Sequence, residues 1–213
     1  MMMREGLRMV LELEKDIQIV GEAEDGRQAV ALVKQLRPAV VLMDIAMPLL
    51  NGLEATRQIC KNFPDTKVLI LSAHGHAAFV KQVTELGAAG FLLKQTSSAV
   101  VARAIREVHK GKTFFSPSIA RHLPAGDPKA LNRGGQSKEK SNHLSSREVE
   151  VLQLIAEGQG NKQVAAELGL SFKTVDKYRQ SLMSKLNIHD VAGLTRYAMA
   201  EGIIESNDRG AIS

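Results

Sequence analysis

The chain has 213 residues, 44% of them hydrophobic and 24% charged, which is ordinary for a soluble globular protein with room for one large domain or two small ones. No apolar run approaches the ~20 residues that a membrane-spanning helix needs, the first residues lack the apolar core of a secretory signal, and the single cysteine, Cys60, excludes an internal disulfide. We therefore expect a cytoplasmic protein without a membrane partner, and the formal charge of +5 hints weakly at a polyanionic partner.

The first part of the chain alternates between short apolar runs and amphipathic stretches. Buried strands are predicted at four apolar runs: 17–20, 40–43, 68–71 and 91–93. The stretches between them repeat apolar residues at helical spacing, as Ala29, Leu32 and Val33 do. This alternation predicts right-handed βαβ units around a doubly wound parallel sheet. Because the chain opens on a helical pattern with no strand before it, the predicted α/β domain, 1–120, is N-terminally incomplete.

A polar segment follows this domain. Apolar residues nearly vanish between 121 and 143, where two prolines, three glycines and charges of both signs gather. Such a composition cannot bury enough apolar surface to fold, so it predicts a flexible linker. The linker leaves 144–213 as a second domain.

The second domain has a helical pattern throughout. Residues 145–148 (Ser-Ser-Arg-Glu) have the form of a capping box and start a helix that we expect to stop at Gly158. Asn161 opens a short second helix, and Ser171 is placed to cap a third helix after a three-residue turn containing glycine. A fourth helix is predicted over 190–200. Two helices joined by such a turn are typical of a helix-turn-helix.

Three chemically complementary residues directly follow predicted strands of the first domain. These are Asp44, Ser72 and Lys94. Because function gathers outside the carboxyl ends of parallel strands, we expect their side chains to converge at one edge of the sheet. The carboxylate could act as a nucleophile toward phosphate, while the hydroxyl and the ammonium stabilise phosphoryl oxygens.

The segments around these residues resemble a known family. Residues 44–52 (Asp-Ile-Ala-Met-Pro-Leu-Leu-Asn-Gly) resemble the phosphoacceptor segment of response-regulator receiver domains, and 71–73 and 90–94 resemble that family's hydroxyl and lysine segments. From 144 to 205 the pattern is similar to a LuxR-type output domain, as in the NarL/FixJ group. The resemblance implies a flavodoxin-like receiver followed by an all-α, four-helix helix-turn-helix domain that binds DNA, and a regulator, not an enzyme.

The resemblance also implies roles for single residues. Asp44 would be phosphorylated by a sensor histidine kinase, and Lys94 would contact the phosphoryl group. Ser72 and Phe91 would be the hydroxyl and the aromatic ring whose movement reports phosphorylation. The carboxylate of Asp44 and the backbone carbonyl of Ala46 would be ligands for Mg²⁺.

The chain departs from the family at its start. Members of the family begin with a strand that ends in a pair of acidic residues, and these bind Mg²⁺; neither the strand nor the pair is present here. Since Mg²⁺ depends on one or two carboxylates in such sites, we expect its binding to be weak or absent. Glu22 and Asp25 follow a different strand and are poor substitutes. Two explanations stay open: a true start upstream of Met1, or a natural truncation that has abandoned phosphorylation.

The third helix of the second domain, from Ser171 to Leu186, is the candidate recognition helix. Residues 145–213 hold eight basic and nine acidic residues, yet 172–185 hold four basic residues against one acidic, so DNA contact should be focused on one helix face. We expect base-edge contacts from Asp176, Lys177 and Gln180. Phosphate contacts are expected from Asn161, Lys162, Lys173, Thr174 and Arg179.

The fourth helix resembles the family's dimerisation helix, with Val191, Leu194 and Ala198 as candidate contacts, although the same residues would also close the small core. A homodimer on two half-sites of a promoter is the expected working form.

The leading prediction is a DNA-binding transcriptional response regulator of a two-component phosphorelay, switched by phosphorylation of Asp44. One alternative is a regulator of the same family that acts without phosphorylation, because the acidic pair is missing. The other is an α/β phosphoryl-transfer enzyme with Asp44 as its nucleophile. That enzyme would need a second carboxylate as general acid or base, and position 46, where an Asp-x-Asp pair would place it, is alanine.

Overall fold

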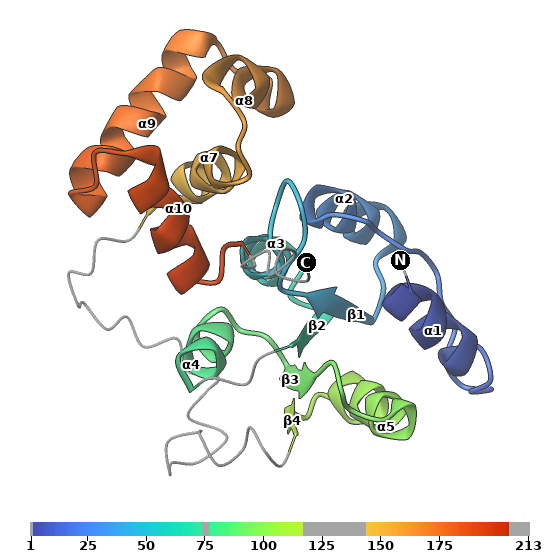
Figure 1. The fold of residues 1–213 in the computed structure, drawn as a ribbon. Helices are drawn as coiled ribbons and strands as arrows, with labels where there is room; N and C mark the ends of the chain where they lie inside the picture. Colours follow the sequence, from blue (N-terminus) through green and yellow to red (C-terminus); the bar gives the residue numbers. More distant parts are fainter. Residues whose placement is uncertain (1, 74–76, 117–143, 205–213) are drawn as a thin grey trace, which may run out of the picture.

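The computed structural model describes residues 2–73, 77–116 and 144–204, which form two units (Figure 1). The N-terminal unit consists, in chain order, of α1 (Met2–Leu11), α2 (Gly26–Leu36), β1 (Val40–Asp44), α3 (Gly52–Asn62), β2 (Lys67–Ser72), α4 (Ala77–Glu85), β3 (Gly90–Leu93), α5 (Ser98–His109) and β4 (Phe114–Phe115). The C-terminal unit consists of α7 (Ser146–Ala156), α8 (Asn161–Leu168), α9 (Phe172–Leu186) and α10 (Val191–Ala200). The predicted linker, 121–143, lies outside the described residues.

The sheet of the N-terminal unit is parallel, as the sequence predicts, with the strand order β1-β2-β3-β4. Its register places Met43 beside Ile70 and Ile70 beside Phe91. The short strand β4 was not predicted from the sequence, because two residues are too few to show a period.

Helices cover both faces of this sheet. Along β2, Val68 and Ile70 belong to one apolar cluster, which also holds buried residues of α2, α3 and α4. Leu69 and Leu71 point to the other face and pack with α5, while Leu7 of α1 contacts the same cluster. Since neighbouring strand residues face opposite sides, this three-layer packing explains why the strands read as continuous apolar runs.

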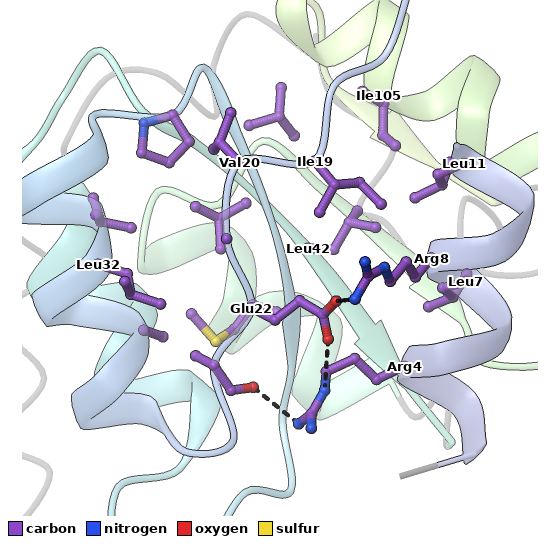
Figure 2. Close-up of a pocket in the computed structure, with 18 of the residues that line it drawn as sticks. Arg4, Leu7, Arg8, Leu11, Ile19, Val20, Glu22, Leu32, Leu42 and Ile105 are labelled. Atoms are coloured by element: carbon purple, nitrogen blue, oxygen red, sulfur yellow. Dashed lines mark hydrogen bonds and ion pairs between the residues drawn. The ribbon is translucent and has the colours of Figure 1, made fainter. Parts of the chain in front are cut away.

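The strand predicted over 17–20 does not form. A strand exists only through hydrogen bonds to a neighbour about 4.8 Å away, and within the described structure residues 18–22 make no backbone hydrogen bond to β1; both segments line a cavity of about 890 Å³ (Figure 2). Figure 2 shows Leu7 and Leu11 of α1 on one side of the segment and Leu32 of α2 on the other. The prediction of a buried strand at 17–20 is therefore wrong: in the described structure these residues alternate between partly exposed and exposed, and Val20 is 49% exposed.

The helix ends of the C-terminal unit match the predicted capping signals. Ser145 and Glu148 form a capping box at the start of α7, and Gly158 after its end has φ of 90°. Ser171 caps α9 by accepting a hydrogen bond from the Thr174 N–H. The four helices enclose one core of fully buried side chains, such as Leu152, Val175, Leu182 and Leu194. No helix in the described part of the chain has the length and apolarity to cross a membrane.

Candidate functional site

Asp44 and Lys94 meet at the carboxyl edge of the sheet. Asp44 ends β1, and Lys94 directly follows β3. The Lys94 Nζ lies 2.7 Å from Asp44 Oδ2, and the Ala46 backbone N–H donates to Asp44 Oδ1 at 3.3 Å. The Asp44 side chain is 32% exposed, so the carboxylate is paired with a cation and still open to solvent. A carboxylate placed in this way can attack a phosphorus atom arriving from solvent, while the ammonium neutralises the transferred oxygens.

Ser72 and Phe91 complete the predicted set. Ser72 ends β2 between the two charged residues and is buried, and its carbonyl accepts the Lys94 backbone N–H at 2.8 Å. Phe91 lies on β3 with no exposed surface, in the core that α3 and α4 share. The three strand ends therefore converge as expected, while the switching roles of Ser72 and Phe91 remain predictions.

The loop after Asp44 folds back so that Gly52 lies against the backbone of Asp44 and Ile45. The Gly52 N–H donates to the Ile45 carbonyl at 2.8 Å, and a Cβ on Gly52 would lie 1.8 Å from the Asp44 carbonyl oxygen. Any other residue would push the backbone of Asp44 out of place. Asn51 then caps α3 by accepting a hydrogen bond from the Glu54 N–H at 2.9 Å. The Asn-Gly pair in the motif is thus required by the loop that carries the carboxylate.

Glu22 and Asp25, the acidic residues that follow the segment 17–20, are bound by other groups. Glu22 forms ion pairs with Arg4 and Arg8, and the Asp25 carboxylate accepts two backbone N–H groups as the cap of α2. Among the described residues, no group of three or more His, Cys, Asp or Glu side chains is arranged to hold a metal ion. If the Asp44 carboxylate and the Ala46 carbonyl are the ligands, as the resemblance implies, Mg²⁺ has a poor donor set here.

The exposed face of α9 carries two of the three predicted base contacts and one predicted phosphate contact, while the third base contact, Asp176, is partly buried. Lys173, Lys177 and Gln180 are exposed, and Figure 1 places α9 on the side of the C-terminal unit away from the sheet. Lys162 is likewise exposed in the first turn of α8. Sequence reasoning missed Phe172, which is 54% exposed at the first position of α9. Phe172 stands three positions before Val175, at the apolar spacing of the helix, so the sequence pattern favours a core position and gave no signal of its exposure.

Asn161, Asp176 and Arg179 form a polar network between α8 and α9, and Thr174 binds the cap of its own helix. The Asn161 side chain donates to Asp176 at 3.4 Å and accepts from Arg179 at 3.1 Å. Gln180 donates to the other oxygen of Asp176 at 2.9 Å. Thr174 is held by Ser171 at 2.8 Å. These contacts lock the first turn of α8 against the middle of α9, so they fix how the two helices of the motif present their faces.

The predicted dimerisation residues of α10 do not share one environment. Leu194 and Ala198 have no exposed surface, because they fill the core of their own unit. Val191 is 41% exposed, and Met199, two turns later on the same stripe, is 39% exposed. In this arrangement a partner can contact Val191 and Met199, whereas Leu194 and Ala198 are out of its reach.

Glu148 organises the polar side of the C-terminal unit. Its side chain is 5% exposed and accepts hydrogen bonds from Ser145, Ser181 and Lys185. Burial alone would raise the pKa of the Glu148 carboxyl, but the Lys185 ammonium and the serine donors outweigh it and lower that pKa to about 2. The start of α7 and the end of α9 are therefore joined through one buried carboxylate.

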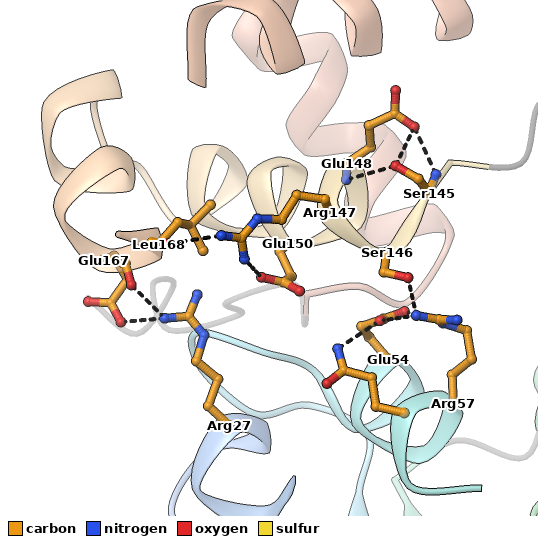
Figure 3. Close-up of polar contacts among 11 residues, drawn as sticks. Arg27, Glu54, Arg57, Ser145, Ser146, Arg147, Glu148, Glu150, Glu167 and Leu168 are labelled. Carbon is orange, nitrogen blue, oxygen red and sulfur yellow. Dashed lines mark hydrogen bonds and ion pairs between the residues drawn. The ribbon is translucent and has the colours of Figure 1, made fainter. Parts of the chain in front are cut away.

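The two units touch through polar contacts (Figure 3). Arg27 in α2 lies 2.7 Å from the Glu167 carboxylate in α8 and also donates to the Glu167 carbonyl at 2.9 Å. Arg57 in α3 donates both to Glu54 and to the Ser146 hydroxyl at the start of α7. These contacts bring α7 and the end of α8 against α2 and α3, on the side away from the exposed face of α9.

Gln153 of α7 binds the loop that follows Asp44. Its side chain is fully buried; the amide donates to the Met47 carbonyl at 2.9 Å and accepts the Asn51 N–H at 2.7 Å. Leu49, between these residues, has φ of 65° and packs against the core of the C-terminal unit. The C-terminal unit thus holds the loop after Asp44 at two points, Met47 and Asn51. Sequence reasoning missed Gln153, whose only signal is a polar residue among the apolar positions of α7.

Comparison with known families accounts for both units. Residues 1–106 match the family model described as "Response regulator receiver domain". Residues 142–198 match the model described as "Bacterial regulatory proteins, luxR family".

Relatives match over nearly the whole chain. The oxygen regulatory protein NreC of Staphylococcus carnosus is 36% identical over 95% of this chain and 94% of its own length. The transcriptional regulatory protein LiaR of Bacillus subtilis is 37% identical over 92% of both chains. Among solved structures, a chain from the structure of two RcsB dimers bound to two parallel DNAs is similar to this chain. It has a TM-score of 0.54 and 28% identity over 93% of both chains. The receiver domain of a putative response regulator, NarL of Mycobacterium tuberculosis, has a TM-score of 0.51 and 37% identity over 52% of this chain and 90% of its own.

Proposed function

This chain belongs to the response regulators that join a receiver domain to a LuxR-type DNA-binding domain, and on that premise we propose that it is a cytoplasmic transcription regulator switched at Asp44. We propose the domain bounds 1–120 and 144–213, with 121–143 as the tether. The observation that supports the proposal is the contact of Gln153 with Met47 and Asn51 in the loop after Asp44, since a change at Asp44 that moves this loop would alter a contact with the output domain.

In the proposed reaction, a carboxylate oxygen of Asp44 attacks the phosphorus of a phosphohistidine on a sensor histidine kinase. The phosphorus–nitrogen bond breaks, its electron pair stays on the imidazole, which takes up a proton, and an acyl phosphate forms. Lys94, which pairs with the free carboxylate at 2.7 Å, then pairs with the phosphoryl oxygens. The added charge and bulk lie next to a loop whose carbonyl and N–H bind Gln153, so the domain contact weakens.

The docked arrangement leaves the exposed face of α9 uncovered. We therefore infer that phosphorylation acts on the pairing of two output domains, and that it does not unmask the recognition helix. Promoter DNA would be read by Lys177 and Gln180, and the network around Asn161 would position them. A homodimer would meet through Val191 and Met199.

Acetyl phosphate tests the proposal on the full chain. We expect the intact mass to rise by one phosphoryl group for the unaltered protein and for the control Asp65→Asn, whose side chain is exposed in a loop, and to stay unchanged for Asp44→Asn. Equal labelling of Asp44→Asn would contradict the assignment of the phosphoacceptor.

A second candidate function is regulation without phosphorylation. Two observations favour it: the donor set for Mg²⁺ is poor, and Lys94 already neutralises Asp44. In that case acetyl phosphate labels no variant, while the full chain still binds duplex DNA. The plot of the logarithm of the DNA association constant against the logarithm of the salt concentration has a negative slope. If Lys162 contacts a phosphate, this slope should be shallower by about one unit for Lys162→Ala.

A further inference from the structure

Phe172 is a large apolar side chain that lies outside the cores of the described structure. It is the first residue of α9 and is 54% exposed, and it belongs to none of the three apolar clusters. The other phenylalanines whose side chains are described all lie in those clusters: Phe63, Phe91, Phe114 and Phe115. Because a ring left in solvent gives up the burial that ordinarily makes phenylalanine stabilising, Phe172 contributes little to the stability of its own domain.

The start of α9 holds this ring in a fixed place. The Ser171 hydroxyl caps the helix by accepting the Thr174 N–H at 3.1 Å, and it lies 2.8 Å from the Thr174 hydroxyl. Leu170, just before the cap, packs against the core of the C-terminal unit. Since the backbone is anchored on both sides of Phe172, only the side-chain torsions of the ring remain free. A ring presented in this way loses little conformational freedom when it binds a partner.

Phe172 also stands in line with two of the predicted base contacts. Phe172, Asp176 and Gln180 are four residues apart, so each is the neighbour of the next on the helix surface. Gln180 donates to Asp176 at 2.9 Å, and Figure 1 places α9 on the side of its unit away from the sheet. In a helix-turn-helix the N-terminal residues of the recognition helix contact base edges. The ring therefore lies at the end of α9 that approaches the bases.

The chemistry of the ring restricts what it can recognise there. A phenyl group neither donates nor accepts a conventional hydrogen bond, so on a base edge it can cover only an apolar group. In the major groove that group is the C5-methyl of thymine. We propose that Phe172 is a specificity-determining residue whose ring covers the methyl group of a thymine in the promoter. The inference rests on the proposed reading of DNA by α9 and adds an apolar contact to its polar ones.

The test uses duplexes that the full chain selects from a random-sequence library. The same selection with Phe172→Ala should lose a preference for thymine at a defined position of the site. One thymine at that position is then replaced by uracil, which differs only in lacking the methyl group. We expect uracil to weaken binding of the unaltered chain about fourfold, because one methyl group leaves an apolar contact. Phe172→Ala should bind the thymine and uracil duplexes equally, so the ring and the methyl group are coupled in a double-mutant cycle.

Two further variants separate this contact from a general loss of affinity. Lys173→Ala, a predicted phosphate contact, should weaken binding to both duplexes by the same factor and keep the preference for thymine. Phe172→Leu keeps an apolar side chain and should keep that preference, and urea unfolding of each free variant checks that it folds. The inference is overturned if the unaltered chain binds both duplexes equally, or if Phe172→Ala still prefers thymine. Failure to select any sequence would instead overturn the reading of DNA by α9, and this inference with it.

Discussion

Replacing Glu148 by glutamine should destabilise the C-terminal domain in a pH-dependent way. The carboxyl has a pKa of about 2 in the folded protein and an ordinary value of 4.5, a difference that corresponds to about 3 kcal/mol of stability at neutral pH. Because the folded-state pKa is depressed, this contribution is fully present above pH ~4.5 and is lost as the pH falls toward 2. By pH 3 less than half of it should remain.

Tyrosine fluorescence isolates this effect. The chain has no tryptophan, and its two tyrosines, Tyr178 and Tyr197, both lie in the C-terminal domain, so urea unfolding followed at the tyrosine emission reports on that domain within the full chain. We expect Glu148→Gln to lose about 2–3 kcal/mol at pH 7 and to approach the unaltered protein at pH 3. The control Glu201→Gln changes an exposed carboxylate and should be nearly neutral. A loss that is the same at both pH values would refute the role of the charge and leave only a packing effect.

Three further predictions concern the loop, the domain contact and the recognition helix. Gly52→Ala should lower the free energy of unfolding in urea by several kcal/mol, since its Cβ would lie 1.8 Å from the Asp44 carbonyl oxygen. Gly6→Ala lies on the open surface of a helix and should instead raise that free energy by about 0.5–1 kcal/mol. Equal effects would contradict the close approach of Gly52 to Asp44. Gln153→Leu removes two contacts between the domains, so the ratio of docked to undocked molecules should fall roughly tenfold for about 1–2 kcal/mol lost. The radius of gyration in solution scattering should then rise, and an unchanged scattering curve would count against a role of Gln153 in docking. Ser171→Ala removes the cap of α9 and should lower stability by about 1 kcal/mol in the tyrosine assay.

Local chemistry decided the features that sequence reasoning predicted well. The capping box at Ser145, the cap at Ser171 and the glycine end of α7 depend on neighbours within four residues, so the pattern carried them without a structure. The convergence of Asp44 with Lys94 is a long-range contact, yet it was predictable because parallel strands of one sheet end at the same edge.

The sequence by itself therefore determined the two kinds of domain, their helix ends and the chemistry of the strand ends. Only the tertiary structure decided that residues 17–20 form no strand, since pairing depends on a neighbour and not on the segment. It also decided that Leu194 and Ala198 face the core, because an apolar residue on a helix has the same pattern whether its cover is its own domain or a partner. Gln153 is the clearest case: its two hydrogen-bond partners in the N-terminal unit are more than 100 positions away, and no local period encodes a contact between two domains.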